Sequence, residues 1–178
     1  MSERADSVGM SAVSNDTEDA DATKYLVFLL GDEAYAVEVV RVEEVLEFTT
    51  IARVPRTPDF LLGVVNLRGR VLPVMDLRSR LGLEHVELTD ENRLIVINTR
   101  CGGEQISLTA LADSVVGVLD IENDALEPAP RFGDSAGAAD STILAGLARM
   151  PDRIVLLMDV DRLLTAELLA ESYAALKT

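Results

Sequence analysis

The chain has 178 residues, 48% of them hydrophobic, and carries a formal net charge of −15. This length fits one domain, or two small lobes with a shared core. So acidic a surface repels nucleic acid and anionic lipid, which makes both poor candidate partners. There is no Trp and there are only three Tyr and four Phe, so aliphatic side chains must fill the core, which favours β-strands.

The first 23 residues form an acidic segment with six acids, one base and no sustained hydrophobic periodicity. Such a segment buries too little apolar surface to offset its loss of entropy, so residues 1–23 are expected to be a disordered tail. They lack the basic start and apolar stretch of a signal peptide. No apolar run approaches the roughly 18–20 residues that span a bilayer. We therefore expect a cytoplasmic protein without membrane insertion.

The first half of the chain reads as short strands. Two apolar runs, residues 25–30 and 34–40, flank a Gly-Asp-Glu turn and predict a hairpin. Residues 41–48 place apolar side chains at helical spacing, with acids between them, and predict a short helix. Residues 51–54 are expected to be a short strand.

A second hairpin is predicted from residues 61–65 and 71–77, which the sequence Asn-Leu-Arg-Gly-Arg separates. Pro73 favours an edge position or a bulge in the second strand. Residues 78–81 make about one helical turn, and Gly82 is a natural C-cap.

Two segments of the chain repeat. Residues 70–81 read RVLPVMDLRSRL and residues 153–164 read RIVLLMDVDRLL, an ungapped match at an offset of 83. Residues 26–28 also resemble residues 95–97. Duplication explains the match economically, although two similar edge strands could have converged. We expect two β-lobes, roughly residues 24–83 and 84–166, between which strands can be exchanged.

The rest of the chain supplies connections. Residues 84–91 are a polar connector, residues 133–141 are expected to be a mobile surface loop, and residues 165–177 to be a C-terminal helix. Many short strands and few helices indicate an all-β fold with short helices.

No set of residues supports catalysis or metal binding. The one His, His85, reads as a solvated loop residue, and Cys101 reads as a turn residue, with a reactive thiol as the alternative. One Cys and one His are too few for a usual metal site. Asp76 and Asp159 stand at strand-to-helix junctions, where capping is a simpler role than a catalytic carboxylate pair. We expect no enzymatic activity, no metal and no cofactor.

Arg68 is the most informative charged residue, because it lies between Gly63 and Gly69 on a short predicted turn. A guanidinium held there can bond a carboxylate or carbonyl groups on a partner. It can equally pair within the chain, with Glu44 or Glu47, and the sequence leaves both interpretations open.

The segment GVVNLRGRVLPVMDLRSRLGL, residues 63–83, resembles the signature of the CheW family of bacterial chemotaxis couplers. The opening YLVFLLGDEAYAVEVVRVEEVLE, the segment VPRTPDFLLGVVN, the EPAP at residues 127–130 and the closing RIVLLMDVDRLL also match. The resemblance covers about residues 24–166. The stretch SLTALADSVVGV, residues 107–118, departs from the family pattern, as does the acidic tail.

The resemblance implies two five-stranded SH3-like β-barrels that share a core. It implies a non-enzymatic adaptor between a CheA-type histidine kinase, bound through its regulatory domain, and the cytoplasmic hairpin of methyl-accepting chemoreceptors in arrays at the membrane. Receptor contacts then fall on Val42, Glu44, Gly63, Asn66 and Arg68, whereas the kinase contact is not assigned to residues.

Three other functions stay open at this point. The chain could be a CheW-like coupling protein of a non-flagellar pathway that drives pili or gene expression. It could be a β-barrel that binds a small ligand or nucleic acid, although acidity and few aromatic residues count against base stacking. It could be an enzyme of an unrecognised type.

Overall fold

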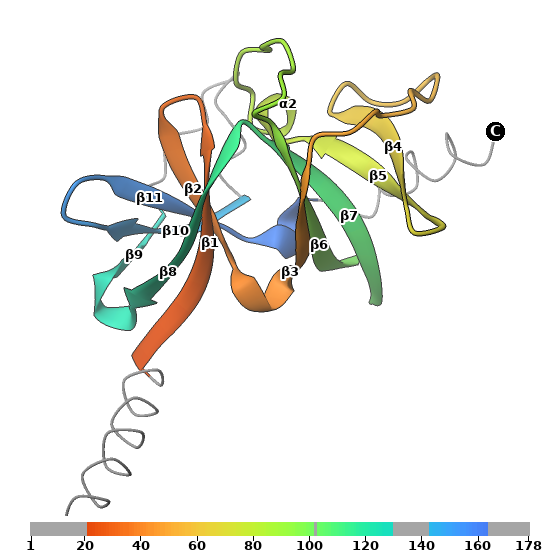
Figure 1. Ribbon diagram of the computed structural model, residues 1–178. Helices are drawn as coiled ribbons and strands as arrows, with labels where there is room; N and C mark the ends of the chain where they lie inside the picture. Colours follow the sequence, from red (N-terminus) through yellow and green to blue (C-terminus); the bar gives the residue numbers. More distant parts are fainter. Residues whose placement is uncertain (1–20, 102, 130–142, 164–178) are drawn as a thin grey trace, which may run out of the picture.

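The computed structural model describes residues 21–101, 103–129 and 143–163 (Figure 1). The predictions for residues 1–20 of the tail, for the loop at 133–141 and for the helix at 165–177 therefore lie outside the described residues. The described part is built mainly of strands, which confirms the expected all-β fold. Its short helical segments are α2 (Leu77–Arg80) and the 3-10 turns η1 (Val39–Arg41), η2 (Asn123–Ala125) and η4 (Val160–Arg162).

The strands form two sheets, with six and five strands where five each were expected. The six-stranded sheet has the order β8-β1-β2-β11-β10-β9. Its strands are β1 (Ala22–Leu30), β2 (Glu33–Glu38), β8 (Ser114–Glu122), β9 (Leu126–Pro128), β10 (Leu144–Arg149) and β11 (Ile154–Met158). The five-stranded sheet has the order β3-β6-β7-β5-β4. Its strands are β3 (Val42–Glu47), β4 (Leu61–Leu67), β5 (Arg70–Asp76), β6 (Arg93–Cys101) and β7 (Glu104–Ala112).

Each sheet takes strands from both halves of the chain. The hairpin β1–β2 joins the sheet of β8 to β11, and the hairpin β6–β7 joins the sheet of β3 to β5 (Figure 1). Both joins are parallel, β2 against β11 and β7 against β5. These two parallel pairings use equivalent residues of the repeat. Val74 pairs with Thr109, and Leu157, which corresponds to Val74 at the offset of 83, pairs with Ala36.

The repeated segments also share their local geometry. The Asp76 N–H donates to the Phe60 carbonyl and the Asp159 N–H donates to the Ile143 carbonyl, both at 2.7 Å. Each pair of residues is related by the offset of 83. Both hairpins have a register shift at the same place, before Gly63 in β4 and before Gly146 in β10.

The main core lies between the two sheets and belongs to both. It includes Phe28 and Tyr35 from one sheet, which stack with their ring centroids 6.1 Å apart, and Ile95 and Ile97 from the other. A smaller apolar cluster then backs each sheet separately. Burial of each such side chain contributes about 1.5–3 kcal/mol, so the shared cluster ties the two sheets into one folding unit.

The helix predicted at residues 41–48 is wrong. Residues 39–41 form η1 and the rest of the segment is β3, whose side chains alternate between half-buried and exposed. Val42, Glu44 and Leu46 are half-buried and Val45 is 38% exposed. A register shift between Val42 and Glu44 places Val42 on the main core and Leu46 on the cluster that backs the five-stranded sheet. Because Glu44 is half-buried, Val45 is exposed and the register shifts, residues 42–47 do not show the simple alternation of apolar and polar residues that a strand usually has.

Three smaller predictions also need correction. The strand expected at residues 51–54 is a single bridge between Ala52 and Val64. Ordered structure begins before Tyr25, because Ala22 in β1 already pairs with Glu122. Cys101 is not an exposed turn residue, since it ends β6 and is buried in the main core.

The predictions for the second hairpin are confirmed. Gly82 has φ +77° and its N–H donates to Ser79 at the end of α2. Pro73 lies in β5 where only β4 pairs with the strand, since the pairing with β7 begins at Val74. The missing N–H of proline therefore breaks no ladder hydrogen bond.

Candidate functional site

The β4–β5 turn holds Arg68 in a fixed position. Arg68 and Gly69 have φ of +53° and +85°, which matches the type I′ turn that suits the twist of a tight hairpin. The Asn66 side-chain oxygen accepts a hydrogen bond of 3.0 Å from the Gly69 N–H and so closes the turn. The turn therefore projects the Arg68 guanidinium from the end of the hairpin.

Arg68 forms a two-pronged ion pair with Glu44 of β3. Its Nη1 and Nη2 donate to the two carboxylate oxygens at 2.8 and 3.1 Å. Of the two internal partners considered from sequence, the structure selects Glu44. The Arg68 side chain is 79% exposed and that of Glu44 is 21% exposed, so other N–H groups of the guanidinium face solvent.

A second acid–arginine pair lies beside the first, and sequence reasoning missed it. Arg70 donates to Glu43 at 2.9 Å and to the Ser107 hydroxyl at 2.9 Å. Ser107 in turn donates to the Asn98 side chain at 2.9 Å. A register shift in β3 between Val42 and Glu44 allows Glu43 to face outward. The sequence signal that could have revealed this second pair is that two consecutive acids, Glu43 and Glu44, could match the two arginines of the turn, Arg68 and Arg70.

These residues define one exposed face, which we call the β3–turn surface: Glu43, Glu44, Asn66, Arg68 and Arg70. Two apolar side chains are exposed near it along the same strands, Val45 on β3 and Val71 on β5, the latter 61% exposed. Val45 follows Glu44 and Val71 follows Arg70 directly in their strands, so both valines point to the opposite face of the sheet from these charged residues.

Of the five receptor-contact residues expected from sequence, the structure brings Glu44, Asn66 and Arg68 together on this surface. Val42 lies on the same strand but is half-buried and packs on the main core. Gly63 is buried, and a Cβ there would lie 2.1 Å from the Ala52 carbonyl oxygen. Gly63 thus allows two backbone segments to approach each other beneath the surface.

Asp76 and Asp159 are helix caps, as predicted. The Asp76 carboxylate accepts from the Arg78 N–H and the Asp159 carboxylate accepts from the Asp161 N–H, both at 3.1 Å. Each carboxylate thus satisfies a backbone donor that the first turn of a helix leaves free.

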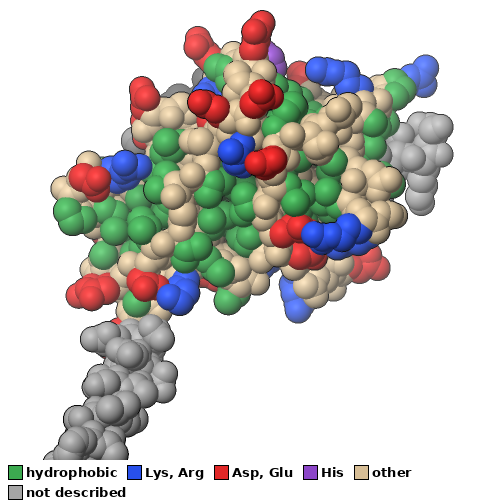
Figure 2. Space-filling view, in the orientation of Figure 1, with side chains coloured by type: hydrophobic (Ala, Val, Ile, Leu, Met, Phe, Trp, Pro, Cys, Tyr) green, Lys and Arg blue, Asp and Glu red, His purple; other side chains and the backbone are tan. Residues whose placement is uncertain are grey.

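The face of the molecule in Figure 2 has mixed chemistry. Charged side chains lie mostly around its margin, with blue and red groups often side by side, and apolar side chains lie between them (Figure 2). The strand β8, at the edge of the six-stranded sheet, contributes exposed Val116, Val118 and Leu119. Within the part of the chain that the structure describes, no three His, Cys, Asp or Glu side chains gather as metal ligands would.

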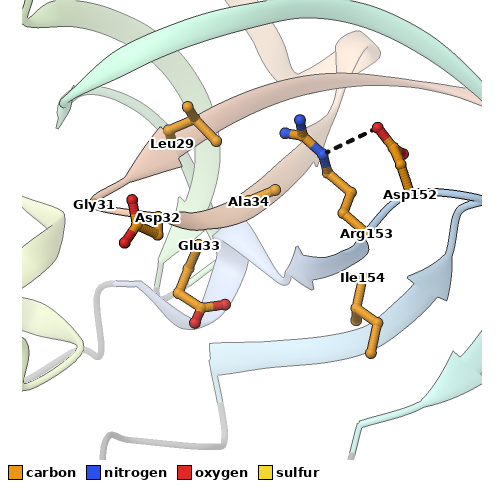
Figure 3. Close-up of a pocket in the computed structure, with 8 residues that line it drawn as sticks. All are labelled: Leu29, Gly31, Asp32, Glu33, Ala34, Asp152, Arg153 and Ile154. Carbon is orange, nitrogen blue, oxygen red and sulfur yellow. Dashed lines mark ion pairs between the residues drawn. The ribbon is translucent and has the colours of Figure 1, made fainter.

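A hollow of about 450 Å³ lies between the β1–β2 and β10–β11 turns (Figure 3). Its lining includes the acids Asp32, Glu33 and Asp152, and Arg153 stands 3.9 Å from the Asp152 carboxylate. The lining is as polar as it is apolar and the hollow opens to solvent, whereas small-molecule sites are mostly apolar and enclosed. Among the described residues, none of the helices has the length and apolar character to cross a membrane.

Comparison with known proteins identifies the family. The family model of the CheW-like domain matches residues 24–168. The chemotaxis protein CheW of Klebsiella aerogenes is 31% identical over 162 residues, which cover 91% of this chain and 93% of that protein. CheW of Thermotoga maritima is 32% identical, over 82% of this chain and 91% of its own length.

A solved structure agrees with the sequence comparisons. The scaffolding protein TtCheW from Thermoanaerobacter tengcongensis superimposes with a TM-score of 0.70 at 28% identity, covering 80% of this chain and 92% of that one. The family-model match, residues 24–168, spans strands of both sheets, the β3–turn surface and both repeated segments. The chain therefore belongs to the CheW family.

Proposed function

We propose that this protein is a non-enzymatic adaptor that couples the cytoplasmic hairpin of methyl-accepting chemoreceptors to the regulatory domain of a CheA-type histidine kinase. The observation that carries the proposal is the CheW-like match over residues 24–168, which includes nearly all of the described β-structure. Relatives over most of this length are chemotaxis proteins. The adaptor acts in the cytoplasm at receptor arrays and uses no cofactor.

The β3–turn surface is the proposed receptor contact. A receptor hairpin is a pair of helices that presents carboxylates and apolar side chains. Arg68 can donate to such a carboxylate while it remains paired with Glu44, because its guanidinium is largely exposed.

The two less exposed candidates support this contact from beneath. Val42 anchors β3 to the main core, which fixes the position of Glu44 two residues later. Gly63 lets β4 lie against Ala52, which fixes the hairpin that ends in Arg68. A substitution at either residue disturbs the receptor contact through the position of the ion pair.

The kinase contact must lie elsewhere on the molecule, since an adaptor holds both partners at once. No residues are assigned to it. The proposal requires only that the kinase leave the β3–turn surface free.

A bridging experiment tests the adaptor function. The regulatory domain of a CheA-type kinase from the same cell is immobilised, and a soluble receptor hairpin is added with or without this protein. The proposal predicts that the receptor is retained only when this protein is present. Binding of this protein to neither partner, or to one partner only in competition with the other, would contradict it.

A further inference from the structure

Among the described residues, two partly buried ion pairs join the two halves of the chain, and the exchange of hairpins creates both. The first joins Arg78, after β5, to Asp113, between β7 and β8. Arg78 Nε donates to Asp113 Oδ1 at 3.0 Å and Nη2 donates to Oδ2. The same carboxylate accepts a 2.7 Å hydrogen bond from the Gly31 N–H. Arg78 is 14% exposed and Asp113 is 26% exposed.

The second contact joins Arg41, in η1, to Asp161, in η4. Arg41 Nη1 lies 3.3 Å from Asp161 Oδ2, and Nη2 donates to Oδ1. The carboxylate also accepts from the Arg100 N–H at 2.9 Å and from the Thr99 hydroxyl at 3.0 Å. We call these two contacts the Arg78 clasp and the Arg41 clasp.

The clasps occupy equivalent places in the duplicated fold. Arg78 and Asp161 are related by the offset of 83, and each lies two residues after a capping aspartate. The two backbone amides that donate to the carboxylates belong to Gly31, just after β1, and to Arg100, near the end of β6. They are also equivalent, because the registers relate β1 to β6 by 69 residues.

The opposite members of the clasps correspond as well. Asp113 lies in the connection between β7 and β8, and Arg41 lies in the equivalent connection between β2 and β3. The strand registers make residue 40 the equivalent of Asp113, so Arg41 is one residue further along the chain. The Leu29 carbonyl accepts from the backbone N–H of Asp113, and the equivalent Asn98 carbonyl accepts from Nε of the Arg41 side chain. The two clasps therefore occupy equivalent places in the two halves, with the charges reversed.

Because the charges are reversed between the clasps, each half of the chain contributes residues of one charge sign to both clasps. The N-terminal half contributes Arg41 and Arg78, and the C-terminal half contributes Asp113 and Asp161. If two N-terminal halves from different copies paired in the same fold, Arg41 would face Arg78 at both clasps. If two C-terminal halves paired, Asp113 would face Asp161. Arg78 and Asp113 are largely buried, and Arg41 and Asp161 are 28% and 40% exposed. Like charges at such partly buried contacts are costly, which is how interfaces reject wrong partners.

We infer that the reversed polarity of the two clasps makes the halves pair with each other and prevents either half from pairing with its like on a second copy of the chain. A same-polarity arrangement would hold the monomer equally well but would allow both kinds of self-pairing. The inference is independent of the proposed adaptor function.

A third charged contact between the halves provides a contrast. Lys24 pairs with Asp120 at 2.8 Å, and at the equivalent place Glu47 faces Arg93 in register. Here each half carries one acid and one base, so the contact does not discriminate between pairings. It is also exposed, at 58% and 57% for the first pair, where ion pairs contribute little. Discrimination therefore rests on the clasps.

Exchanging the charges of one clasp tests the inference in the full chain. Arg78→Asp with Asp113→Arg keeps both clasps attractive but gives them the same polarity, and Arg41→Asp with Asp161→Arg does the same at the other clasp. Making all four substitutions restores reversed polarity. The matched control, Lys24→Asp with Asp120→Lys, exchanges an exposed charge pair between the halves and leaves the clasps with reversed polarity. It gives each half a single sign at the third contact, so it can only disfavour self-pairing.

Each protein is unfolded, refolded over a range of concentrations and measured for dimer content by size-exclusion chromatography with light scattering. Each one-clasp exchange is expected to raise the dimer fraction about tenfold, which corresponds to a like-charge penalty of about 1.4 kcal/mol. The fourfold exchange should match the unmodified chain, and the control should not raise the dimer fraction above it. The inference is overturned if the one-clasp exchanges leave the dimer fraction unchanged, if the fourfold exchange raises it equally, or if neither one-clasp exchange folds.

Discussion

Glu44 is half-buried in β3, with its carboxylate at the surface. Arg68 supplies two hydrogen bonds from a turn that projects it across the strand. Because Arg68 is largely exposed, their pairing contributes about 0–1 kcal/mol to stability. Arg68 can therefore be replaced with little loss of folding, which makes its role in binding open to direct measurement.

The clasp carboxylates give stability that depends on pH. Hydrogen bonding from Arg41 lowers the pKa of Asp161, against the opposing effect of burial. Burial by itself raises the pKa of Asp113, but hydrogen bonds from Arg78 and Gly31 outweigh it and leave that pKa lowered. A carboxyl whose folded pKa is below its unfolded pKa stabilises the fold above the unfolded value, and this contribution is lost as the pH falls through the folded value.

We therefore expect the free energy of unfolding to fall as the pH drops below about 4, the ordinary range of an aspartate. Asp161→Asn should be less stable than the unmodified chain at pH 7, and the two should converge in acid. Urea unfolding at a series of pH values measures this. Asp152→Asn, which removes an exposed acid, serves as the control. Curves for Asp161→Asn and the unmodified chain that stay parallel from pH 7 to pH 2 would contradict the account.

The helix caps give a second prediction at single residues. Asp76→Ala should lower the free energy of unfolding by about 0.5–2 kcal/mol, because the Arg78 N–H loses its acceptor. Asp76→Asn should cost less, since asparagine also caps. Asp159 should follow the same pattern. Denaturant unfolding measures all four variants, and equal losses for Ala and Asn would show that charge, and not capping, is what Asp76 provides.

At the scale of elements, the sequence predicts the hairpins well and β3 badly. The hairpins are strong signals because apolar runs flank residues that permit positive φ, as at Gly31 and Gly69. In β3 the pattern is dominated by the site itself. Glu44 can be half-buried because Arg68, 24 residues away, pairs with its carboxylate. The hydrophobic pattern of β3 alone cannot reveal a partner so distant in sequence.

The glycine in each repeated hairpin is expected to be essential for that hairpin. Gly63 has φ +153°, and an added Cβ would lie 2.1 Å from the Ala52 carbonyl oxygen. Gly63→Ala should therefore cost at least about 1–3 kcal/mol. At Gly146 the Cβ would lie 2.6 Å from the Glu127 carbonyl oxygen, so Gly146→Ala should also destabilise the fold.

The control for these variants is Gly69→Asn. Gly69 has positive φ but nothing within 4 Å of an added Cβ, and asparagine tolerates that conformation better than other residues do. Thermal melts should show a smaller loss for Gly69→Asn than for Gly63→Ala. A larger loss for Gly69→Asn would mean that crowding of a Cβ at Gly63 costs less than the positive φ at Gly69, which would contradict the account.

At the scale of the whole molecule, the repeat indicated the duplication but not which strands meet. The order of strands depends on contacts far apart in the chain, such as Val74 with Thr109, which a local pattern does not encode. The site was predicted in part for the same reason. Motif resemblance gave Glu44, Asn66 and Arg68, whereas the neighbouring contact of Arg70 with Glu43 and Ser107 becomes visible only when β3, β5 and β7 are placed.

The N-terminal boundary of the fold gives a prediction for truncation. Ala22 and Thr23 pair with β8, and Lys24 pairs with Asp120. Deletion of residues 1–24 should therefore lower the melting temperature below that of a deletion of residues 1–20, by about 2–4 °C for each kcal/mol lost. Equal melting temperatures would show that the first three residues of β1 add no stability.

The account rests on an adaptor whose receptor contact is separate from its kinase contact, and Arg68→Ala tests this most directly. The variant is titrated against a purified receptor hairpin and, separately, against the kinase regulatory domain, with a thermal melt of each protein. Arg149→Ala is the matched control. Arg149 is also an exposed arginine paired with an acid, Glu127, but both residues lie in the six-stranded sheet, away from the β3–turn surface.

We expect Arg68→Ala to weaken receptor binding by about 1–3 kcal/mol, the usual loss when a charged hydrogen bond at an interface is removed. Affinity for the kinase should stay within about twofold, since distant sites act independently, and the melting temperature should change little. Arg149→Ala should leave receptor binding unchanged. Equal losses toward both partners together with a lowered melting temperature, or full receptor binding by Arg68→Ala, would contradict the account.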